Sequence, residues 1–263
     1  MAKRFHENLK ESLISDVYVD SYENVLKEIK EKDPEIIINC AGKTGIKNID
    51  WCEDNKIETI KGNIECPLIL LKATEELNKY FVHIGSGCVY QGDNNGKGFS
   101  EEDKPNFEGS FYIRTKITTE NILKDFPVLQ LRIKMPADSK EDNKNLITKL
   151  SRYNKILDVE NSITIVKDAI YAAKILMDKR KTGIYNLVNP GVIKNTEILA
   201  MYKEIVDSNI EYEVISENKL LSIVKADRSN CMLNTDKLKN EHIILPDIKE
   251  SIKNILEEYI KNV

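Results

Sequence analysis

Residues 35–42 read Glu-Ile-Ile-Ile-Asn-Cys-Ala-Gly, and this stretch decides the fold class. Three consecutive isoleucines make an unbroken apolar run, which is typical of a strand buried on both faces of a parallel sheet. Similar apolar runs at 81–84 and 128–133 predict two more buried strands. We therefore predict that 35–39 is a central strand of a parallel sheet.

Helical segments alternate with these strands over the first two-thirds of the chain. Ser21 is expected to cap a helix over 22–31, which Asp33–Pro34 ends. The other predicted helices lie at 7–15, 50–59, 67–78, from about 110, and at 145–153, 167–177, 196–206 and 248–260, with further strands at 16–19 and 183–187. This alternation predicts an α/β fold, a Rossmann-like doubly wound parallel sheet over 1–136. A small C-terminal substrate lobe, interleaved with the last strands, is predicted over 137–263.

Composition narrows the class of protein. Of 263 residues, 41% are apolar and 31% charged, and the net charge is −4, so nothing favours nucleic-acid or membrane binding. The five cysteines are odd in number and form no C-x-x-C pair, and the three histidines are scattered. We expect neither a disulfide framework nor a metal site, and we expect a reducing cytoplasm.

The beginning of the chain departs from the usual dinucleotide-binding pattern. Such folds open with a strand and a glycine-rich turn whose backbone N–H groups bind the pyrophosphate. Here a predicted helix comes first, and the first glycine is Gly42. Either the fold does not bind a dinucleotide, or the first strand and glycine-rich loop lie upstream of Met1. In the second case, cofactor affinity of the chain as given is expected to be reduced.

Three residues form a pattern suited to carbonyl reduction. Tyr112 and Lys116 lie one helical turn apart in a Y-x-x-x-K pair, and Ser86 follows a buried strand between two glycines. A cation beside the phenol would lower its pKa toward the working range, and serine and tyrosine could then both hydrogen-bond a carbonyl oxygen. The alternatives are a chance pair and a turn serine, because the chain has eleven tyrosines and many lysines.

Several motifs, in this order, resemble the extended short-chain dehydrogenase/reductase family. They include Asn-Cys-Ala-Gly-Lys-Thr-Gly at 39–45, Gly-Ser-Gly-Cys at 85–88, Leu-Arg-Ile-Lys-Met-Pro at 131–136 and Leu-Ile-Thr-Lys at 146–149. Within that family the chain is similar to the dTDP-4-dehydrorhamnose reductase branch, and most similar to its bifunctional 3,5-epimerase/4-reductase members. The resemblance covers essentially the whole chain from Lys3 onward.

The resemblance implies catalytic roles at matching positions. Ser86, Tyr112 and Lys116 would form the reductase triad, with Tyr112 and Lys116 also binding the cofactor, NADP(H) or NAD(H). Cys88 and Lys149 match the pair used for epimerisation, as base and acid beside the C4 ketone. The alternatives are a small buried apolar residue for Cys88 and a solvated helix lysine for Lys149.

Binding residues are also implied by the resemblance. The predicted cofactor contacts are Asn39, Ala41, Gly42 and Asn63. The predicted substrate contacts are Ser86, Gly87, Asn189, Arg228 and Asn230, with the Arg228 guanidinium suited to a diphosphate. No metal ligand is predicted.

The expected function is therefore NAD(P)H-dependent epimerisation and reduction of a 4-keto-6-deoxyhexose nucleotide to a rhamnose nucleotide. One alternative is the 4-reductase alone, with Cys88 structural. Another is a non-catalytic nucleotide-sugar-binding subunit, or a truncated, cofactor-deficient homologue. The sequence leaves open whether the nucleotide is dTDP or UDP. A homodimer is one open alternative for the oligomeric state.

Overall fold

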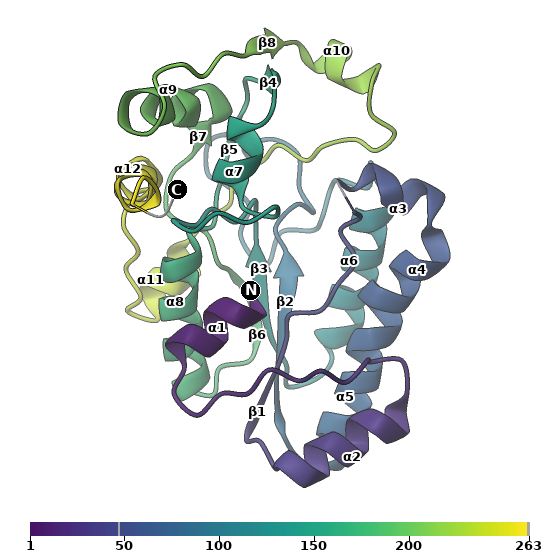
Figure 1. The fold of residues 1–263 in the computed structure, drawn as a ribbon. Helices are drawn as coiled ribbons and strands as arrows, with labels where there is room; N and C mark the ends of the chain where they lie inside the picture. Colours follow the sequence, from purple (N-terminus) through teal and green to yellow (C-terminus); the bar gives the residue numbers. More distant parts are fainter. Residues whose placement is uncertain (47, 262–263) are drawn as a thin grey trace.

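A four-stranded parallel sheet forms the centre of the computed structural model, which describes residues 1–46 and 48–261 (Figure 1). In this part of the chain the strand order is β1-β2-β3-β6. The strands are β1 (Ile36–Asn39), β2 (Tyr80–Ser86), β3 (Leu129–Ile133) and β6 (Gly183–Asn186). Each lies within a predicted apolar run or extends it by a residue or two, so the predicted α/β class and parallel sheet are confirmed.

The prediction that 35–39 is a central strand is wrong for the described residues. β1 pairs only with β2, so it lies at an edge of the sheet, and Ile36, Ile37 and Ile38 are only half-buried. A central place requires a strand on each side. The predicted strand at 16–19 does not form, because its valines pack onto the helical core beside α2 instead.

The first helix also differs from the prediction of 7–15. α1 (Ala2–Asn8) ends at Asn8, and Leu9 takes an extended conformation. The Ser12 hydroxyl donates a hydrogen bond to the Leu9 carbonyl oxygen at 2.8 Å, and Glu11 has a φ of 60°. This left-handed residue turns the chain out of the helix.

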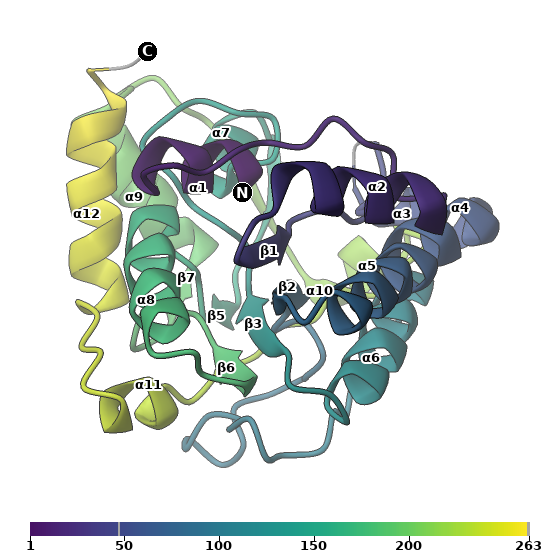
Figure 2. The same cartoon turned by 90° about the horizontal axis from the view of Figure 1, so that it is seen from below.

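Helices cover both faces of the sheet (Figure 2). One face carries α2 (Tyr22–Lys32), α5 (Cys66–Glu76) and α6 (Phe111–Leu123), which share an apolar core. The other face carries α1 and α8 (Val166–Asp178), with Phe5 of α1 buried among the strands and α8. α3 (Asp50–Asp54), α4 (Lys56–Ile60) and the π-helix η1 (Lys61–Glu65) lead into α5. The arrangement is doubly wound.

A second apolar core lies at the carboxyl end of the sheet and joins three helices. They are α7 (Leu146–Ser151), α9 (Asn195–Ile205) and α12 (Ile248–Tyr259). Two short strand pairs accompany them, β4 (Lys155–Leu157) with β8 (Glu213–Ile215), and β5 (Glu160–Asn161) with β7 (Ile193–Lys194). α10 (Glu217–Leu221) and α11 (Asp236–Asn240) complete the described chain.

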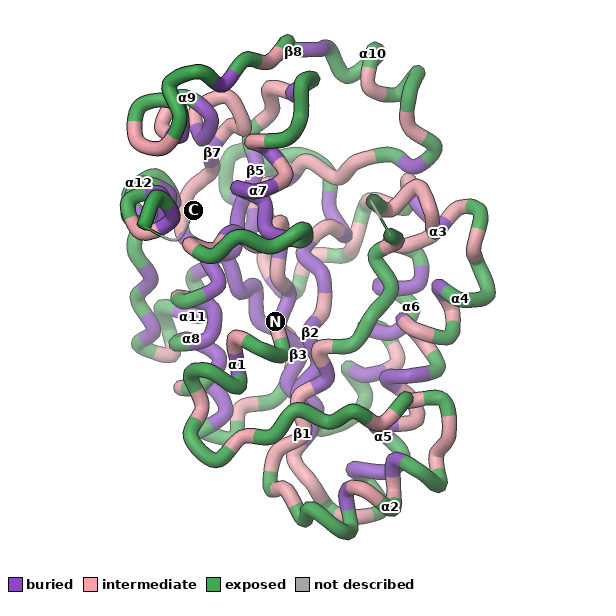
Figure 3. The backbone as a smooth tube through the Cα atoms, in the orientation of Figure 1, coloured by how far each residue is buried: buried purple, intermediate pink, exposed green. Residues whose placement is uncertain are grey.

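The predicted cap at Ser21 is confirmed, because Ser21 precedes α2 and accepts a hydrogen bond from the Asn24 backbone N–H at 3.4 Å. The helix predicted from about 110 begins at Phe111, and Ser110 before it accepts a hydrogen bond from the Ile113 backbone N–H at 3.2 Å. Figure 3 shows that the strands are largely buried, whereas the outer faces of the helices are exposed. None of the helices in the described ranges has the length and apolarity needed to span a bilayer.

Candidate active site

Ser86 and Tyr112 meet at the carboxyl end of the sheet. Ser86 is the last residue of β2 and is buried, and Tyr112 lies in the first turn of α6. Burial raises the pKa of the Tyr112 phenol above its usual value, and the nearby Ser86 hydroxyl only partly opposes this. The expected lowering by a cation is therefore not seen; the phenol stays protonated at neutral pH and can donate a proton.

Lys116 lies one turn after Tyr112 on α6, and its amine contacts β2. The Nζ atom donates to the Ile84 carbonyl oxygen at 3.2 Å and lies 3.5 Å from Nε2 of His83. Burial lowers the pKa of Lys116 to about 8, while the charges of Glu120 and Cys66 act in the opposite direction. The amine therefore changes charge close to the working pH range, which suits a residue that takes part in proton transfer.

Cys88 lies directly beyond Ser86, where the chain turns. Its backbone N–H donates to the Ser86 hydroxyl oxygen at 3.2 Å, and its side chain packs against the same apolar cluster as Tyr112. The Nζ atom of Lys134 lies 3.7 Å from the Cys88 sulfur and donates to the carbonyl and hydroxyl oxygens of Ser229 at 3.1 and 3.3 Å. The site thus places a thiol between a hydroxyl pair and a buried ammonium group.

Sequence reasoning gave Lys134 no role. The side chain is 1% exposed, although lysine is almost never fully buried without a purpose or a partner. The sequence did contain a signal for a functional role, because Lys134 directly follows the buried strand β3. The carboxyl ends of such strands are where ligands bind in folds of this kind. What the sequence could not show is that its amine reaches Cys88.

Lys149 lies on α7, whose N-cap is Asn145. Burial lowers the pKa of the Lys149 amine, as does the charge of Lys144, while Asp142 opposes both. The charged groups that act on Lys149 are therefore those of its own segment. The amine in contact with the Cys88 sulfur is that of Lys134.

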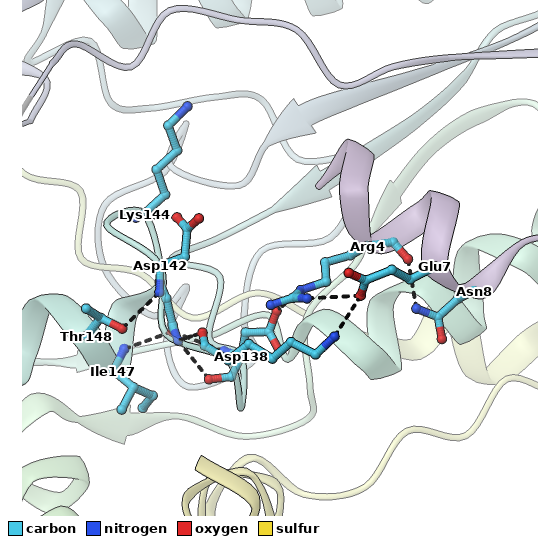
Figure 4. A network of polar contacts seen from close by, with 10 residues as sticks. Arg4, Glu7, Asn8, Asp138, Asp142, Lys144, Ile147 and Thr148 are labelled. Carbon is cyan, nitrogen blue, oxygen red and sulfur yellow. Dashed lines mark hydrogen bonds and ion pairs between the residues drawn. The ribbon is translucent and has the colours of Figure 1, made fainter. Parts of the chain in front are cut away.

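The segment before α7 is tied to α1 by ion pairs (Figure 4). Nε of Arg4 lies 2.5 Å from Asp138, and Glu7 lies 3.0 Å from both Arg4 and Lys140. Arg4 and Asp138 are both largely shielded from solvent. These contacts hold the segment that precedes Lys149 against the first helix.

The predicted cofactor residues lie at the carboxyl end of β1. Ala41 and Gly42 are exposed, and the Ala41 backbone N–H donates to Oδ1 of the buried Asn39 at 2.9 Å. Asn63 is buried, and its amide bonds the backbone N–H and carbonyl of Lys43 at 2.7 and 3.0 Å. The two asparagines therefore shape this loop, which leaves its backbone open to a ligand.

The chain's own residues fit the nicotinamide end of a dinucleotide. Lys116 has no carboxylate in hydrogen-bond contact among the described residues, and the exposed loop at Ala41 and Gly42 adjoins the same edge of the sheet. This is where ligands bind in open α/β sheets. Residues 1–41 contain no glycine, so this stretch has no glycine-rich turn for the pyrophosphate of a dinucleotide.

Two predicted substrate residues are packed into the structure. Gly87 is buried, and a Cβ atom there would lie 2.6 Å from a Leu233 methyl carbon, so a larger residue would displace that side chain. Asn189 is also buried, with its amide bonded to the backbone N–H of Ile165 at 3.0 Å and to Asp168 at 2.6 Å. The roles of both residues in substrate binding stay predictions.

The other two lie between α10 and α11, in a segment whose backbone is hydrogen-bonded to Gly92. Arg228 is half-buried, and its Nη2 atom lies 3.0 Å from Asp50. Asn230 accepts a hydrogen bond from Asn161 at 3.1 Å. A substrate phosphate at Arg228 would share the guanidinium with Asp50, and this role also stays a prediction.

A parallel sheet with serine, tyrosine and lysine at the carboxyl end of its strands defines the short-chain dehydrogenase/reductase class of NAD(P)-dependent enzymes. Residues 8–261 match the family described as the RmlD substrate binding domain. The chain belongs to this family.

Similar proteins come from several organisms. The chain is 40% identical over 238 residues to the bifunctional dTDP-4-dehydrorhamnose 3,5-epimerase/dTDP-4-dehydrorhamnose reductase of Arabidopsis thaliana. The aligned region covers 88% of this chain and 79% of the Arabidopsis protein. The L780 UDP-rhamnose synthase of Acanthamoeba polyphaga mimivirus has a similar structure, with a TM-score of 0.91, 33% identity, and coverage of 98% and 93%.

A more distant structure shares the fold alone. The dTDP-4-dehydrorhamnose reductase of Bacillus anthracis, solved in complex with NADP, has a TM-score of 0.80 at 18% identity and covers 97% of this chain and 93% of its own. The Rossmann-like architecture is therefore common to relatives of very different sequence.

Proposed function

We propose that the protein is an NAD(P)H-dependent 3,5-epimerase/4-reductase that converts a 4-keto-6-deoxyhexose nucleotide to a rhamnose nucleotide. The observation that carries this proposal is the position of Cys88. Cys88 lies beside Ser86 and Tyr112, and the buried amine of Lys134 lies 3.7 Å from its sulfur.

The reductase step needs two groups at the ketone oxygen. Ser86 and Tyr112 would both donate hydrogen bonds to O4 of the sugar, and Tyr112 would give up its proton to that oxygen. The nicotinamide, when bound, supplies the hydride. Tyr112, Lys116 and the loop at Ala41 and Gly42 are the residues that would hold its reactive end.

The epimerase step needs a base for carbon-bound protons. Protons at C3 and C5 are acidic because they lie next to the C4 ketone, and the hydroxyl pair that binds O4 also stabilises the enolate. Cys88 would remove or return such a proton on its own side of the ring. Lys149 is proposed for the opposite side, from the segment over 137–263 that we propose folds over the sugar.

The 4-reductase alone is the second candidate function. It is favoured by one observation: the charged groups acting on Lys149 belong to its own segment, whereas Cys88 is contacted by Lys134. In that case Cys88 would be a packing residue of the Val89 and Tyr90 cluster. The five free cysteines support our proposal that the protein works in a reducing compartment such as the cytoplasm.

The test supplies NADPH and a 4-keto-6-deoxyglucose nucleotide, as dTDP and as UDP forms, in deuterated water. NADPH oxidation reports reduction, and deuterium at C3 and C5 reports epimerisation. Reduction of a pre-epimerised ketone without exchange would leave the 4-reductase alone. The 263-residue chain is compared with a version that has a strand and a glycine-rich turn fused ahead of Met1. The proposal would be overturned if neither version catalysed reduction or epimerisation.

A further inference from the structure

A buried chain of polar groups runs from β1 across β2 to α6. It consists of the side chains of Asn39, His83 and Lys116, which are 2%, 2% and 7% exposed. Asn39 and His83 are cross-strand partners in the parallel pairing of β1 and β2. Nδ2 of Asn39 lies 3.1 Å from Nδ1 of His83, and Nε2 of His83 lies 3.5 Å from Nζ of Lys116. Sequence reasoning gave His83 no role.

The orientation of the Asn39 amide is fixed by its own loop. The Ala41 backbone N–H, which can only donate, lies 2.9 Å from Oδ1. The other end of the amide, the NH₂ group, is therefore the one that faces His83. Since NH₂ can only donate, Nδ1 of His83 must accept and carries no proton.

This assigns the tautomer of His83. Burial holds the pKa of the imidazole well below its usual range, with the charge of Lys116 acting in the same direction, so the ring is neutral. A neutral imidazole without a proton on Nδ1 carries it on Nε2. The Nε2–H group then points at the Lys116 amine.

An ammonium group cannot accept a hydrogen bond from the Nε2–H group of His83. Lys116 as an ammonium has three donors and no acceptor, whereas its neutral amine has a lone pair that Nε2–H can bond. The Ile84 carbonyl oxygen accepts a hydrogen bond from Lys116 in either form. We infer that His83 is a positioning residue for the reductase lysine, and that its Nε2–H group stabilises the uncharged amine of Lys116 relative to the ammonium form.

The other groups that face Lys116 do not cancel this effect. Glu120 lies one turn further along α6, but both of its oxygens bond the Arg132 guanidinium at 2.7 Å. Cys66, at the start of α5, is a thiol whose pKa burial raises to about 11. The lowered pKa of Lys116, about 8, agrees with a buried amine that lacks a carboxylate partner.

The inference rests on the proposed function in one respect only, namely that Lys116 is the catalytic lysine of the reductase. If Lys116 is the reductase lysine, its charge within the working pH range depends on His83, a residue of β2 that is 2% exposed. Asn39→Asp, which keeps the shape of the side chain, should move the His83 proton from Nε2 to Nδ1. An aspartate there would accept from both Ala41 and Nδ1–H, which would leave the Nε2 lone pair facing Lys116 as an acceptor for the ammonium.

Nuclear magnetic resonance of the unliganded chain tests the inference without any turnover. Long-range ¹H–¹⁵N correlation spectra distinguish the two histidine tautomers, and the chain has only three histidines to assign. The exposed His6 and His242 give matched controls, since His6→Gln and His242→Gln each remove one signal and leave that of His83. In the parent chain at pH 7 we expect His83 with its proton on Nε2. A proton on Nδ1, or on both nitrogens, would overturn the inference.

The titration of Lys116 gives the second measurement. Its ¹³Cε shift, assigned by its loss in Lys116→Met, should titrate near pH 8 in the parent chain. In Asn39→Asp and His83→Gln, where an acceptor faces the amine, the midpoint should rise by about one pH unit or more. An unchanged midpoint in both variants would overturn the inference, and if one variant does not fold the parent tautomer still decides. Absence of enzyme turnover would count against the proposed function and leave these spectra unaffected.

Discussion

The Nζ atom of Lys134 lies 3.7 Å from the Sγ atom of Cys88, and this contact joins the end of β3 to the turn after β2. The same amine donates to the carbonyl and hydroxyl oxygens of Ser229, so it ties the Cys88 turn to the segment around residue 229. Lys134→Met removes these donors from a buried site and should lower the free energy of unfolding by about 1–3 kcal/mol in urea titration. Lys97→Met, at an exposed lysine, is the control and should cost under about 0.5 kcal/mol. Equal losses in the two variants would show that the Lys134 contacts do not stabilise the turn.

Tyr112 is expected to be the proton donor for O4 of the sugar. Tyr112→Phe removes the hydroxyl but keeps the ring against its apolar cluster, so the protein should fold normally and lose reduction by at least about a thousandfold. NADPH oxidation with a pre-epimerised ketone measures this loss. Tyr153→Phe is a matched control on an exposed tyrosine and should react like the parent. Oxidation within tenfold of the parent would remove Tyr112 from the mechanism.

Cys88 and Lys149 are expected to separate the two activities. Cys88→Ala and Lys149→Ala should stop deuterium incorporation at C3 and C5, because each removes one proton-transfer group. Both variants should still reduce a ketone that another enzyme has already epimerised. Lys144→Ala, in the same segment, is the control for Lys149 and should keep exchange. Normal exchange in both variants would leave the 4-reductase as the function.

The ion pair of Arg132 and Glu120 is expected to be a large contributor to stability. Both side chains are buried, with two hydrogen bonds of 2.7 Å between them. Glu120→Ala leaves the guanidinium without a counter-charge and should lower the free energy of unfolding by about 3–5 kcal/mol in urea titration. Glu31→Ala, which breaks the exposed pair with Lys27, should cost under about 1 kcal/mol. Similar losses in the two variants would contradict this difference.

Lys116 should make stability depend on pH. Its pKa is about 8 in the folded chain and near the ordinary value of 10.5 in the unfolded chain, so between these values the unfolded chain binds more protons. Stability relative to Lys116→Met should therefore rise with pH across this window, by up to about 1.4 kcal/mol per pH unit. Urea titrations of the two proteins from pH 7 to 10 measure the difference. A difference that stays constant over this range would show that burial does not lower the pKa of Lys116.

The sequence by itself determined the class of fold, and it led us to propose the residues of the reductase set. Apolar runs identified three strands of the sheet, β1, β2 and β3, because strands covered by helices on both faces are rich in apolar residues. Ser21 and Ser110 marked two helix starts, since a side chain that can cap a backbone N–H is a local signal. The Tyr112–Lys116 spacing placed both residues on one helix face for the same local reason.

Only the tertiary structure decided what these residues touch. The edge position of β1 depends on which strands pair, and no residue within 35–39 records that. Lys134 meets Cys88, and Lys116 meets His83, because β2, β3 and α6 are packed side by side. These partners are 46 and 33 residues apart in the chain. Local patterns report burial and turn geometry, whereas contacts over such separations are set by strand order and helix packing, which require the folded chain.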